Sequence, residues 1–465
     1  MENPFFSLCI VALAATPLVS AAADAGDIAE IRKEIKAIKD GYEARIQALE
    51  ARLKDAEAKV DQAAAATAPV AAAPAASPVS VAAGRPVQSA ANAFNPATSL
   101  VLQGRYANLS QDPNRYAISG FQTGGDIGPG KRGFNLSESE LTLNANVDDK
   151  FYANATLSVT PENRISAEEA YILTTALPAG VNIKAGRFFS GIGYQNEQHQ
   201  HVWDFIDAPL AYQAFLNTQY GQDGVQLKWL APTDLFIELG AELGNGESFP
   251  GTGRNKNGAN AASLTARVGG DIGFSTSWLT GLSVLRTRAD NRESLQIDSA
   301  GNNALTRFTG KSRVGIADFV VKWAPDGNPL VTNFKLQGEY FRRLESGDLT
   351  FDANSALGAI NTDAYRANQS GWYMQGVYQF QPYWRIGLRY DRLDPGSVDY
   401  FSNGLNLAST GFRPNKTSLM VDWSPSEFSR VRLQAARDNS QPGLADNQLF
   451  LQYIMTIGAH GAHKF

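Results

Sequence analysis

The sequence is poor in sulfur-containing residues. Of its 465 residues one is cysteine, Cys9, and four are methionine. Cys9 lies inside an apolar stretch near the N-terminus, so the rest of the chain is excluded from forming disulfides or cysteine-ligated metal sites. The scarcity of methionine, together with 42 glycines and 10% aromatic residues, favours strands over helices.

Long hydrophobic runs and strong net charge are absent too. After Val19 no apolar run reaches the length of about 18 residues that a helix needs to span a bilayer, so this chain would cross a membrane only as a closed barrel. The net charge is −5, which is too small to indicate a nucleic-acid partner.

Catalytic motifs are missing as well, and we expect no enzymatic activity. Gly310-Lys311-Ser312 ends like a phosphate-binding loop, but Leu305 stands where that motif needs its first glycine.

Residues 1–23 are predicted to be a signal peptide. The apolar run Phe5–Val19 is followed by three alanines at 21–23, which match a small-residue cleavage site, although the leading segment contains Glu2 and no basic residue. Cys9 is not at the cleavage point, so we expect no lipid anchor there.

Residues 24–62 are predicted to form a periplasmic coiled coil. Apolar residues recur in steps of three and four from Ile28 to Val60, with a stutter around Tyr42. We expect this helix to self-associate; packing back on the rest of the protein is the alternative. Residues 63–97 are rich in alanine and proline and are predicted to be a disordered linker.

Residues 98–465 have the pattern of a membrane barrel. Sixteen strands are expected: Leu100–Leu109, Leu136–Val147, Phe151–Val159, Ala170–Thr175, Val181–Arg187, Gly224–Leu230, Leu235–Leu243, Ser263–Gly273, Trp278–Thr287, Val314–Trp323, Thr332–Arg342, Gly371–Phe380, Trp384–Asp391, Thr417–Trp423, Arg430–Arg437 and Asn447–Phe465.

Short and long connections separate these strands in a regular way. Seven connections are short turns, such as those at Pro232 and Pro425, while others are long and rich in Gly, Asn and Asp, such as Ser110–Gly133 and Leu344–Ser370. Short periplasmic turns opposite long external loops are typical of bacterial outer-membrane barrels. The predicted fold is therefore all-β: a 16-stranded antiparallel transmembrane β-barrel preceded by a helical coiled coil and a disordered linker.

Side-chain alternation supports this fold. In Leu235–Leu243 the leucines share one face, while Glu238 and Glu242 share the other, as lipid outside and water inside require. Four of the seven tryptophans flank short turns and are predicted to form an aromatic belt at one rim: Trp229, Trp323, Trp384 and Trp423. The last strand runs into Phe465, a terminal aromatic residue of the kind that barrel-assembly machinery recognises.

Three stretches resemble a known family. Phe94–Tyr106, Ala185–Phe205 and His460–Phe465 are similar to outer-membrane proteins related to phosphate-selective porins, some of which are labelled zinc-regulated TonB-dependent receptors. The resemblance covers the whole barrel. It implies a sixteen-stranded, trimeric porin and does not fix the solute.

Charged residues of both signs are predicted to face the lumen. The pore-lining candidates are Arg105, Lys184, Lys228, Arg267, Lys335, Arg385, Arg389, Arg432, Glu138, Glu140, Glu238 and Glu242. A ladder of cations would favour anions, but the acidic residues share the same lumen, so anion and cation selectivity both stay open.

The histidines fall into two pairs, His199/His201 and His460/His463. His199 and His201, with Glu197 and Asp204 nearby, match a zinc-ligand pattern. The alternative is that they hydrogen-bond an infolded loop or lie at the headgroup boundary. No other cofactor is expected.

The sequence therefore favours an outer-membrane channel, with its N-terminal segment in the periplasm, for passive diffusion of small hydrophilic solutes or ions. Outer-membrane lipid, the solute and two further copies of the chain in a homotrimer are the expected partners. The alternatives are a TonB-dependent-type receptor or zinc-handling protein, and a structural barrel tethered to the cell wall by its coiled coil. If the loop Phe188–Gln222 folds inward, it would be the constriction.

Overall fold

The structure is a computed structural model that describes residues 96–407 and 411–458. The predicted signal peptide and coiled coil lie outside the described residues, as do most of the linker and the C-terminal segment with His460, His463 and Phe465. No helix within the described ranges combines the length and apolar character needed to cross a bilayer.

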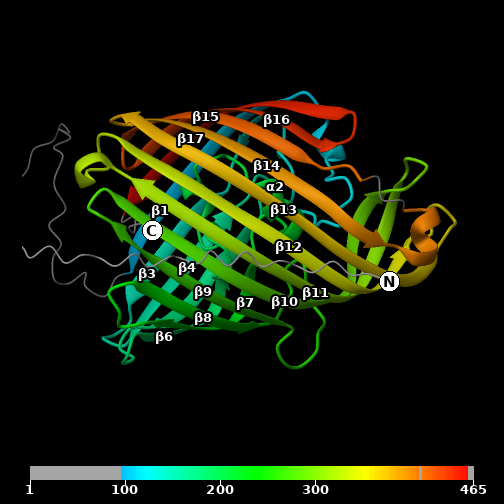
Figure 1. Ribbon diagram of the computed structural model, residues 1–465, viewed down its shortest axis with the longest axis horizontal. Coiled ribbons are helices and arrows are strands. Elements are labelled where there is room, and N and C mark those ends of the chain that lie inside the picture. The colour runs from blue at the N-terminus through cyan, green and yellow to red at the C-terminus, as the bar shows by residue number, and fades with distance from the viewer. Residues whose placement is uncertain (1–95, 408–410, 459–465) are drawn as a thin grey trace, which may run out of the picture. The chain divides into compact units, whose positions relative to one another are not determined.

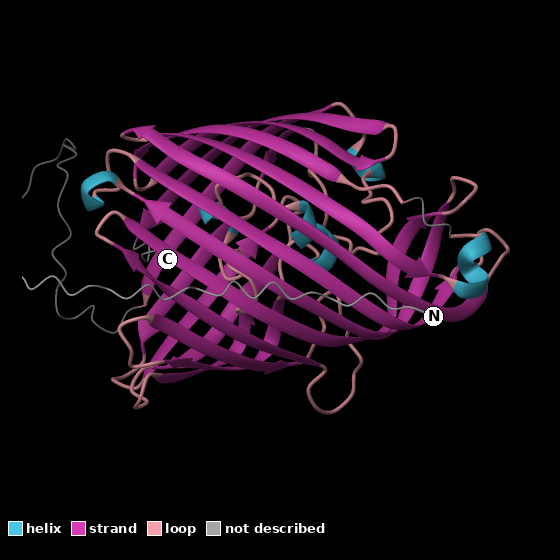
Figure 2. Cartoon of the chain, in the orientation of Figure 1, coloured by secondary structure: helices cyan, strands magenta, loops and turns pink. Residues whose placement is uncertain are grey.

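The β-strands form one antiparallel sheet that closes on itself (Figures 1 and 2). The strands are β1 Ala97–Leu109, β2 Gly133–Leu136, β3 Ser139–Asn146, β4 Phe151–Val159, β5 Ile165–Thr174, β6 Val181–Phe189, β7 Gly221–Leu230, β8 Phe236–Gly244, β9 Ala261–Ile272, β10 Thr276–Ile297, β11 Asn303–Trp323, β12 Asn333–Phe351, β13 Asn361–Gln381, β14 Trp384–Asp399, β15 Asn415–Ser426, β16 Ser429–Gln441 and β17 Leu444–Gly458. The helices are short: η2 Pro113–Arg115, η3 Gln200–Val202, α2 Leu210–Leu216, η4 Pro325–Gly327 and η5 Phe401–Leu405.

Sixteen crossings make up the closed barrel. Neighbouring strands in the sequence are neighbours in the sheet, and β17 pairs with β1 to close it. β2 and β3 both pair with β1 and are separated only by Ser137 and Glu138, so they are two parts of one crossing. The predicted strand number is confirmed, and the predicted single strand Leu136–Val147 is corrected to this broken one.

Apolar side chains face outward and polar side chains face inward. In β17 Leu449, Leu451 and Tyr453 are 44–47% exposed, whereas Gln452 between them is 2% exposed. In β8 Leu243 is 59% exposed and its neighbour Glu242 is 4% exposed. The alternation predicted from the sequence is confirmed, and it is the inverse of a soluble protein, as expected for a barrel surrounded by lipid.

The four tryptophans predicted to share a rim lie at the short-turn ends of their strands. Trp323 ends β11, Trp384 begins β14, and Trp229 and Trp423 lie near the ends of β7 and β15. All four are exposed. Trp384 and Trp423 are cross-strand partners whose ring centroids are 6.0 Å apart.

Strands β10 to β13 are much longer than predicted, with 19 to 22 residues each. The prediction of a long loop at Leu344–Ser370 is wrong, because β12 continues to Phe351 and β13 begins at Asn361. About 9–11 residues suffice for a membrane strand, so these strands, which are long ribbons in Figure 1, are longer than a crossing requires. Their outward side chains become charged in this additional length, which removed the apolar alternation on which the sequence prediction depended.

Candidate functional site

The segment Ser190–Tyr220 between β6 and β7, here called the inserted loop, folds into the barrel. It contains η3 and α2, and every residue of α2 is buried. Figure 2 shows α2 surrounded by strands. The condition under which this loop was expected to be the constriction, namely that it folds inward, is therefore met.

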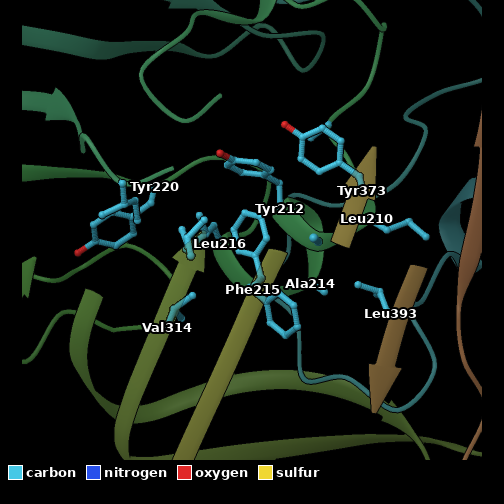
Figure 3. Close-up of a cluster of buried hydrophobic side chains, with 14 of the residues drawn as sticks. Leu210, Tyr212, Ala214, Phe215, Leu216, Tyr220, Val314, Tyr373 and Leu393 are labelled. Atoms are coloured by element: carbon cyan, nitrogen blue, oxygen red, sulfur yellow. The ribbon is translucent and has the colours of Figure 1, made fainter. Parts of the chain in front are cut away.

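An apolar cluster holds α2 inside the lumen. Phe215 and Leu216 of α2 pack with wall residues that include Val314, Phe341 and Leu393 (Figure 3). The loop between β1 and β2 joins the same cluster through Phe121, whose ring centroid lies 5.7 Å from that of Phe215. The sequence prediction missed this helix, although residues 208–216, which are apolar apart from Gln213, are unusual for an external loop.

Two aspartates anchor the inserted loop to the basic side of the wall. Asp204 pairs with Lys335 of β12 and, at 3.2 Å, with Arg385 of β14. Asp207 pairs with Arg389 of β14 at 3.0 Å and Lys416 of β15 at 2.8 Å.

The charge state of both aspartates follows from these neighbours. Burial alone would raise the pKa of each carboxyl group. The adjacent cations outweigh burial and hold the pKa of Asp204 and the pKa of Asp207 well below the usual range, so both anchors are ionised at neutral pH.

Glu339 of β12 binds the backbone of the inserted loop. The N–H groups of Tyr194 and Gln195 donate to its two carboxylate oxygens at 3.1 and 3.0 Å. Gly193 has φ +64°, and a Cβ there would lie 2.4 Å from Glu339 Oε2. A glycine is therefore required for this close approach.

Further contacts fix the start of the inserted loop to the opposite strands. Glu242 of β8 accepts a hydrogen bond from the N–H of Gly191 at 2.8 Å. Glu197 pairs with Lys228 of β7 at 2.8 Å and Arg267 of β9 at 3.1 Å. The inserted loop is thus bonded to inward-facing groups on strands around the barrel.

The two histidines of the inserted loop meet carboxylates of β3 and β5. Nδ1 of His199 lies 3.1 Å from Glu140 and 3.2 Å from Glu168, and its Nε2 lies 3.0 Å from Glu169. Nδ1 of His201 lies 3.0 Å from Glu140. Burial would lower the pKa of His199, but its hydrogen-bonded carboxylates raise that pKa well above the ordinary value.

A β-bulge explains how two consecutive glutamates reach one histidine. The register between β4 and β5 shifts so that Thr156 pairs with Glu169 while Leu157 pairs with Ala167. Glu168 is the extra residue, and the bulge breaks the usual alternation of side chains. The sequence prediction began this strand at Ala170 and therefore missed both glutamates.

The metal-ligand set predicted from the sequence is not brought together. His199 and His201 are close, with ring centroids 5.8 Å apart. Glu197 and Asp204 instead pair with the cations described above, and this part of the prediction is corrected. Within the described residues, the group with ligand atoms all within 4.8 Å of one another is Glu140, Glu168 and His199.

The pore-lining candidates all lie on the barrel wall, and none of them is exposed. Lys184, Lys228, Arg389, Arg432, Glu140 and Glu242 are buried, and Arg105, Arg267, Lys335, Arg385, Glu138 and Glu238 are half-buried. Many contact the inserted loop, and Arg432 donates to the carbonyl of Trp203 at 2.7 Å. At the short-turn end a cavity of about 500 Å³ is lined by Lys322, Lys335 and Arg385, among others.

No model of a known protein family matches the chain. It is 33% identical over 356 residues to an uncharacterized protein of Aquifex aeolicus (strain VF5), and the alignment covers 72% of this chain and 71% of that protein.

Several solved structures are similar to the barrel. OmpT, an outer membrane protein of Vibrio cholerae in its trimer form, has a TM-score of 0.49 and 10% identity over 78% of this chain and 99% of that one. The outer membrane channel DcaP of Acinetobacter baumannii has a TM-score of 0.46 and 11% identity over 78% and 97%. An anion-selective porin from Comamonas acidovorans has a TM-score of 0.46 and 9% identity over 78% and 99%.

Proposed function

The chain belongs to the same family as the Aquifex aeolicus protein, and we propose that it is a porin-like channel of the bacterial outer membrane for passive diffusion of small hydrophilic solutes or ions. A closed antiparallel barrel leaves no unpaired strand edge in lipid. Its exposed apolar outer face and rim tryptophans suit a bilayer environment.

The observation that carries the proposal is the charged, loop-filled lumen. Both signs of charge face inward, with cations on β12, β14, β15 and β16 and carboxylates on β3 and β5. The inserted loop bonds to both sides and reduces the cross-section. This arrangement supports a size-limiting constriction for hydrated solutes.

The receptor alternative lacks support. A receptor powered from the inner membrane uses a barrel of about 22 strands with a plugged lumen. Here sixteen crossings surround a loop that belongs to the barrel itself. No contact of the described residues favours the cell-wall tether, which depends on residues 24–62.

The test is solute uptake by liposomes that contain the purified protein. We expect uptake of small sugars and amino acids with a sharp decline as solute size increases, because the inserted loop narrows the passage. Uptake no faster than in protein-free liposomes would refute a channel.

We also propose that three copies associate, with the segment Ile28–Val60 contributing as a coiled coil. Removing this segment should weaken the oligomer on native gels. The folded barrel should keep its heat-modifiable migration on denaturing gels. A truncated protein that remains fully trimeric would show that the segment Ile28–Val60 does not contribute to association.

The second candidate function is divalent-metal binding at Glu140, Glu168 and His199. About 3.3 Å separates ligand atoms around a tetrahedral zinc ion with bonds of about 2.05 Å. The spacings of 3.1 and 3.2 Å between Nδ1 of His199 and the two carboxylates are close to this value. Imidazole nitrogen favours zinc over calcium or magnesium.

Zinc titration of the intact barrel by calorimetry tests this second function. We expect one site per chain, and at least about a tenfold loss of affinity in His199→Ala and Glu168→Gln. Asp223→Asn should keep the affinity, since Asp223 pairs with the exposed Arg187 and does not hold the inserted loop. Zinc affinity that survives His199→Ala would refute this ligand set, and a complete absence of binding would leave His199 as a protonated partner of the carboxylates.

A further inference from the structure

The outer surface of the long strands has a compact group of cations, here called the basic band: Arg286 and Arg288 of β10 and Lys311 and Arg313 of β11. All four side chains are exposed and point away from the lumen, because they alternate with the buried residues Leu285, Thr287, Ser312 and Val314.

The four cations face each other directly across the two strands. Arg286 is the cross-strand partner of Arg313, and Arg288 is the partner of Lys311. Directly opposed side chains lie about 5 Å apart at Cβ, and like charges there destabilise the sheet. On the adjacent strand, Arg342 adds a further exposed cation.

The cations of the basic band lack ion-pair partners within the described residues. None of its four members forms an ion pair there, although other exposed arginines on the same surface do. Arg307, farther along β11, pairs with Glu293 at 2.8 Å, and Arg187 pairs with Asp223 at 2.6 Å. Four cations without ion-pair partners, in two opposed pairs, are a favourable place for an external anion.

The height of the basic band identifies where that anion would lie. Arg313 precedes Trp323, at the aromatic rim, by ten residues of β11. At about 3.3 Å per residue and a strand tilt of about 40°, this is a rise of about 25 Å. The lipid-facing apolar band of such barrels is also about 25 Å tall.

The side chains between these two levels are apolar, apart from Thr280 of β10, whose hydroxyl donates to the carbonyl of Asp318 at 2.8 Å. Leu282 and Val284 lie on the outer face of β10 between Trp278 and Arg286, and both are exposed. On β11 the outward residues between Arg313 and Trp323 are Gly315, Ala317, Phe319 and Val321. The basic band therefore begins where the apolar belt ends, at the headgroup level of the outer leaflet.

We propose that the basic band binds the phosphate groups of a phosphorylated glycolipid of the outer leaflet. This inference rests on the proposed membrane location. Arginine side chains bind phosphate oxygens in a bidentate manner, and lysine contributes a compact charge. Two opposed pairs of cations match two phosphates on one headgroup, and binding removes the repulsion between the pairs.

The experiment measures binding of lipid A to the purified full-length protein in neutral detergent by native mass spectrometry. We expect lipid A with two phosphates to bind and lipid A without phosphate to bind at least about tenfold more weakly. The variant with Arg286→Gln, Arg288→Gln, Lys311→Gln and Arg313→Gln should lose the preference for the phosphorylated lipid.

Arg307→Gln is the matched control, because it removes an outward cation from the same strand that Glu293 already neutralises. It should bind phosphorylated lipid A like the wild type. Equal binding by the four-residue variant, or equal binding of both lipids by the wild type, would overturn the proposal. Complete displacement of the lipid by inorganic phosphate at about 10 mM would also overturn it, because the band would then be a free-anion site.

Folding of the four-residue variant tests whether the opposed cations repel each other in the wild type. Because neutralisation removes like-charge repulsion, the variant should assemble and should melt no lower than the wild type in lipid-free detergent. A variant that fails to fold would contradict the proposed unfavourable pairing. Lipid binding is measured without any conductance, so its failure is distinguishable from failure of the channel proposal.

Discussion

Asp207 joins the inserted loop to three wall residues, Arg389, Lys416 and Gln434. Replacing Asp207 by Asn removes the carboxylate that Arg389 and Lys416 share, although Arg389 keeps its pair with Asp391 and Lys416 keeps its pair with Asp438. The lost charge-assisted hydrogen bonds cost about 2 kcal/mol, or roughly thirtyfold in the opening equilibrium of the loop. We expect proteolytic cleavage within the inserted loop to become correspondingly faster, as measured by mass spectrometry of the digest.

Asp223→Asn is the control for this substitution. Its partner Arg187 and Asp223 itself are about half exposed, and exposed pairs contribute little to stability. Loop cleavage in this variant should match the wild type. An Asp207→Asn protein that is as resistant as the wild type would show that α2 alone holds the loop.

The pH dependence of the same anchors follows from their depressed pKa values. Cations hold the pKa of Asp207 below its ordinary value of 3.8. A depressed carboxyl pKa contributes stability that is present above the ordinary value and is lost only as the pH falls through the folded value. The difference in single-channel conductance between the wild type and Asp207→Asn should therefore be constant from pH 7 to about 4. A difference that changes stepwise between pH 7 and 5 would contradict this anchoring.

At the scale of elements, the inserted loop accounts for the narrowing of the lumen. Deleting Gln195–Asp207 removes the Asp204 and Asp207 anchors and the histidine contacts together, while the sixteen crossings keep their backbone pairing. We expect a several-fold increase in single-channel conductance in planar bilayers, because more of the lumen becomes accessible to ions. An unchanged conductance would place the constriction elsewhere.

The loops also define the orientation of the barrel. Gly251 follows β8 and Asn361 begins β13 at the end opposite the rim tryptophans, whereas Pro232 and Pro425 lie at the tryptophan end. Cysteines introduced at 251 and 361 should react with an impermeant maleimide on intact cells, and cysteines at 232 and 425 should not. The reverse labelling pattern would show that the tryptophan end of the barrel faces the outside of the cell.

The elements differ in how far the sequence predicts them. The crossings follow from a two-residue period between turn residues, as in Leu235–Leu243, because lipid and lumen each select one face. The bulge at Glu168 and the break at Ser137-Glu138 depend on hydrogen bonding between strands, which no local pattern records. The extensions of β10 to β13 were missed because their outer face is charged.

For the candidate site, the sequence indicates which residues face inward but not which residues meet. Alternation placed Glu140 and Arg389 on the inner face. It did not reveal that His199 contacts Glu168 and Glu169, because those contacts join a loop to a strand about thirty residues earlier in the chain. Such partners follow only from the path of the inserted loop.

At the scale of the whole molecule, an apolar exterior surrounds a polar lumen that an inserted loop crosses. Our proposal is that this lumen connects two aqueous compartments and that the inserted loop narrows the passage between them. The central claim is therefore that the intact protein conducts ions.

Conductance of the full-length protein in a planar lipid bilayer tests this claim most directly. We predict discrete steps with a linear current–voltage relation at low voltage and a conductance that scales with salt concentration, as expected for a water-filled passage. A bilayer that contains correctly folded, heat-modifiable barrel and remains electrically silent at all voltages would contradict the account.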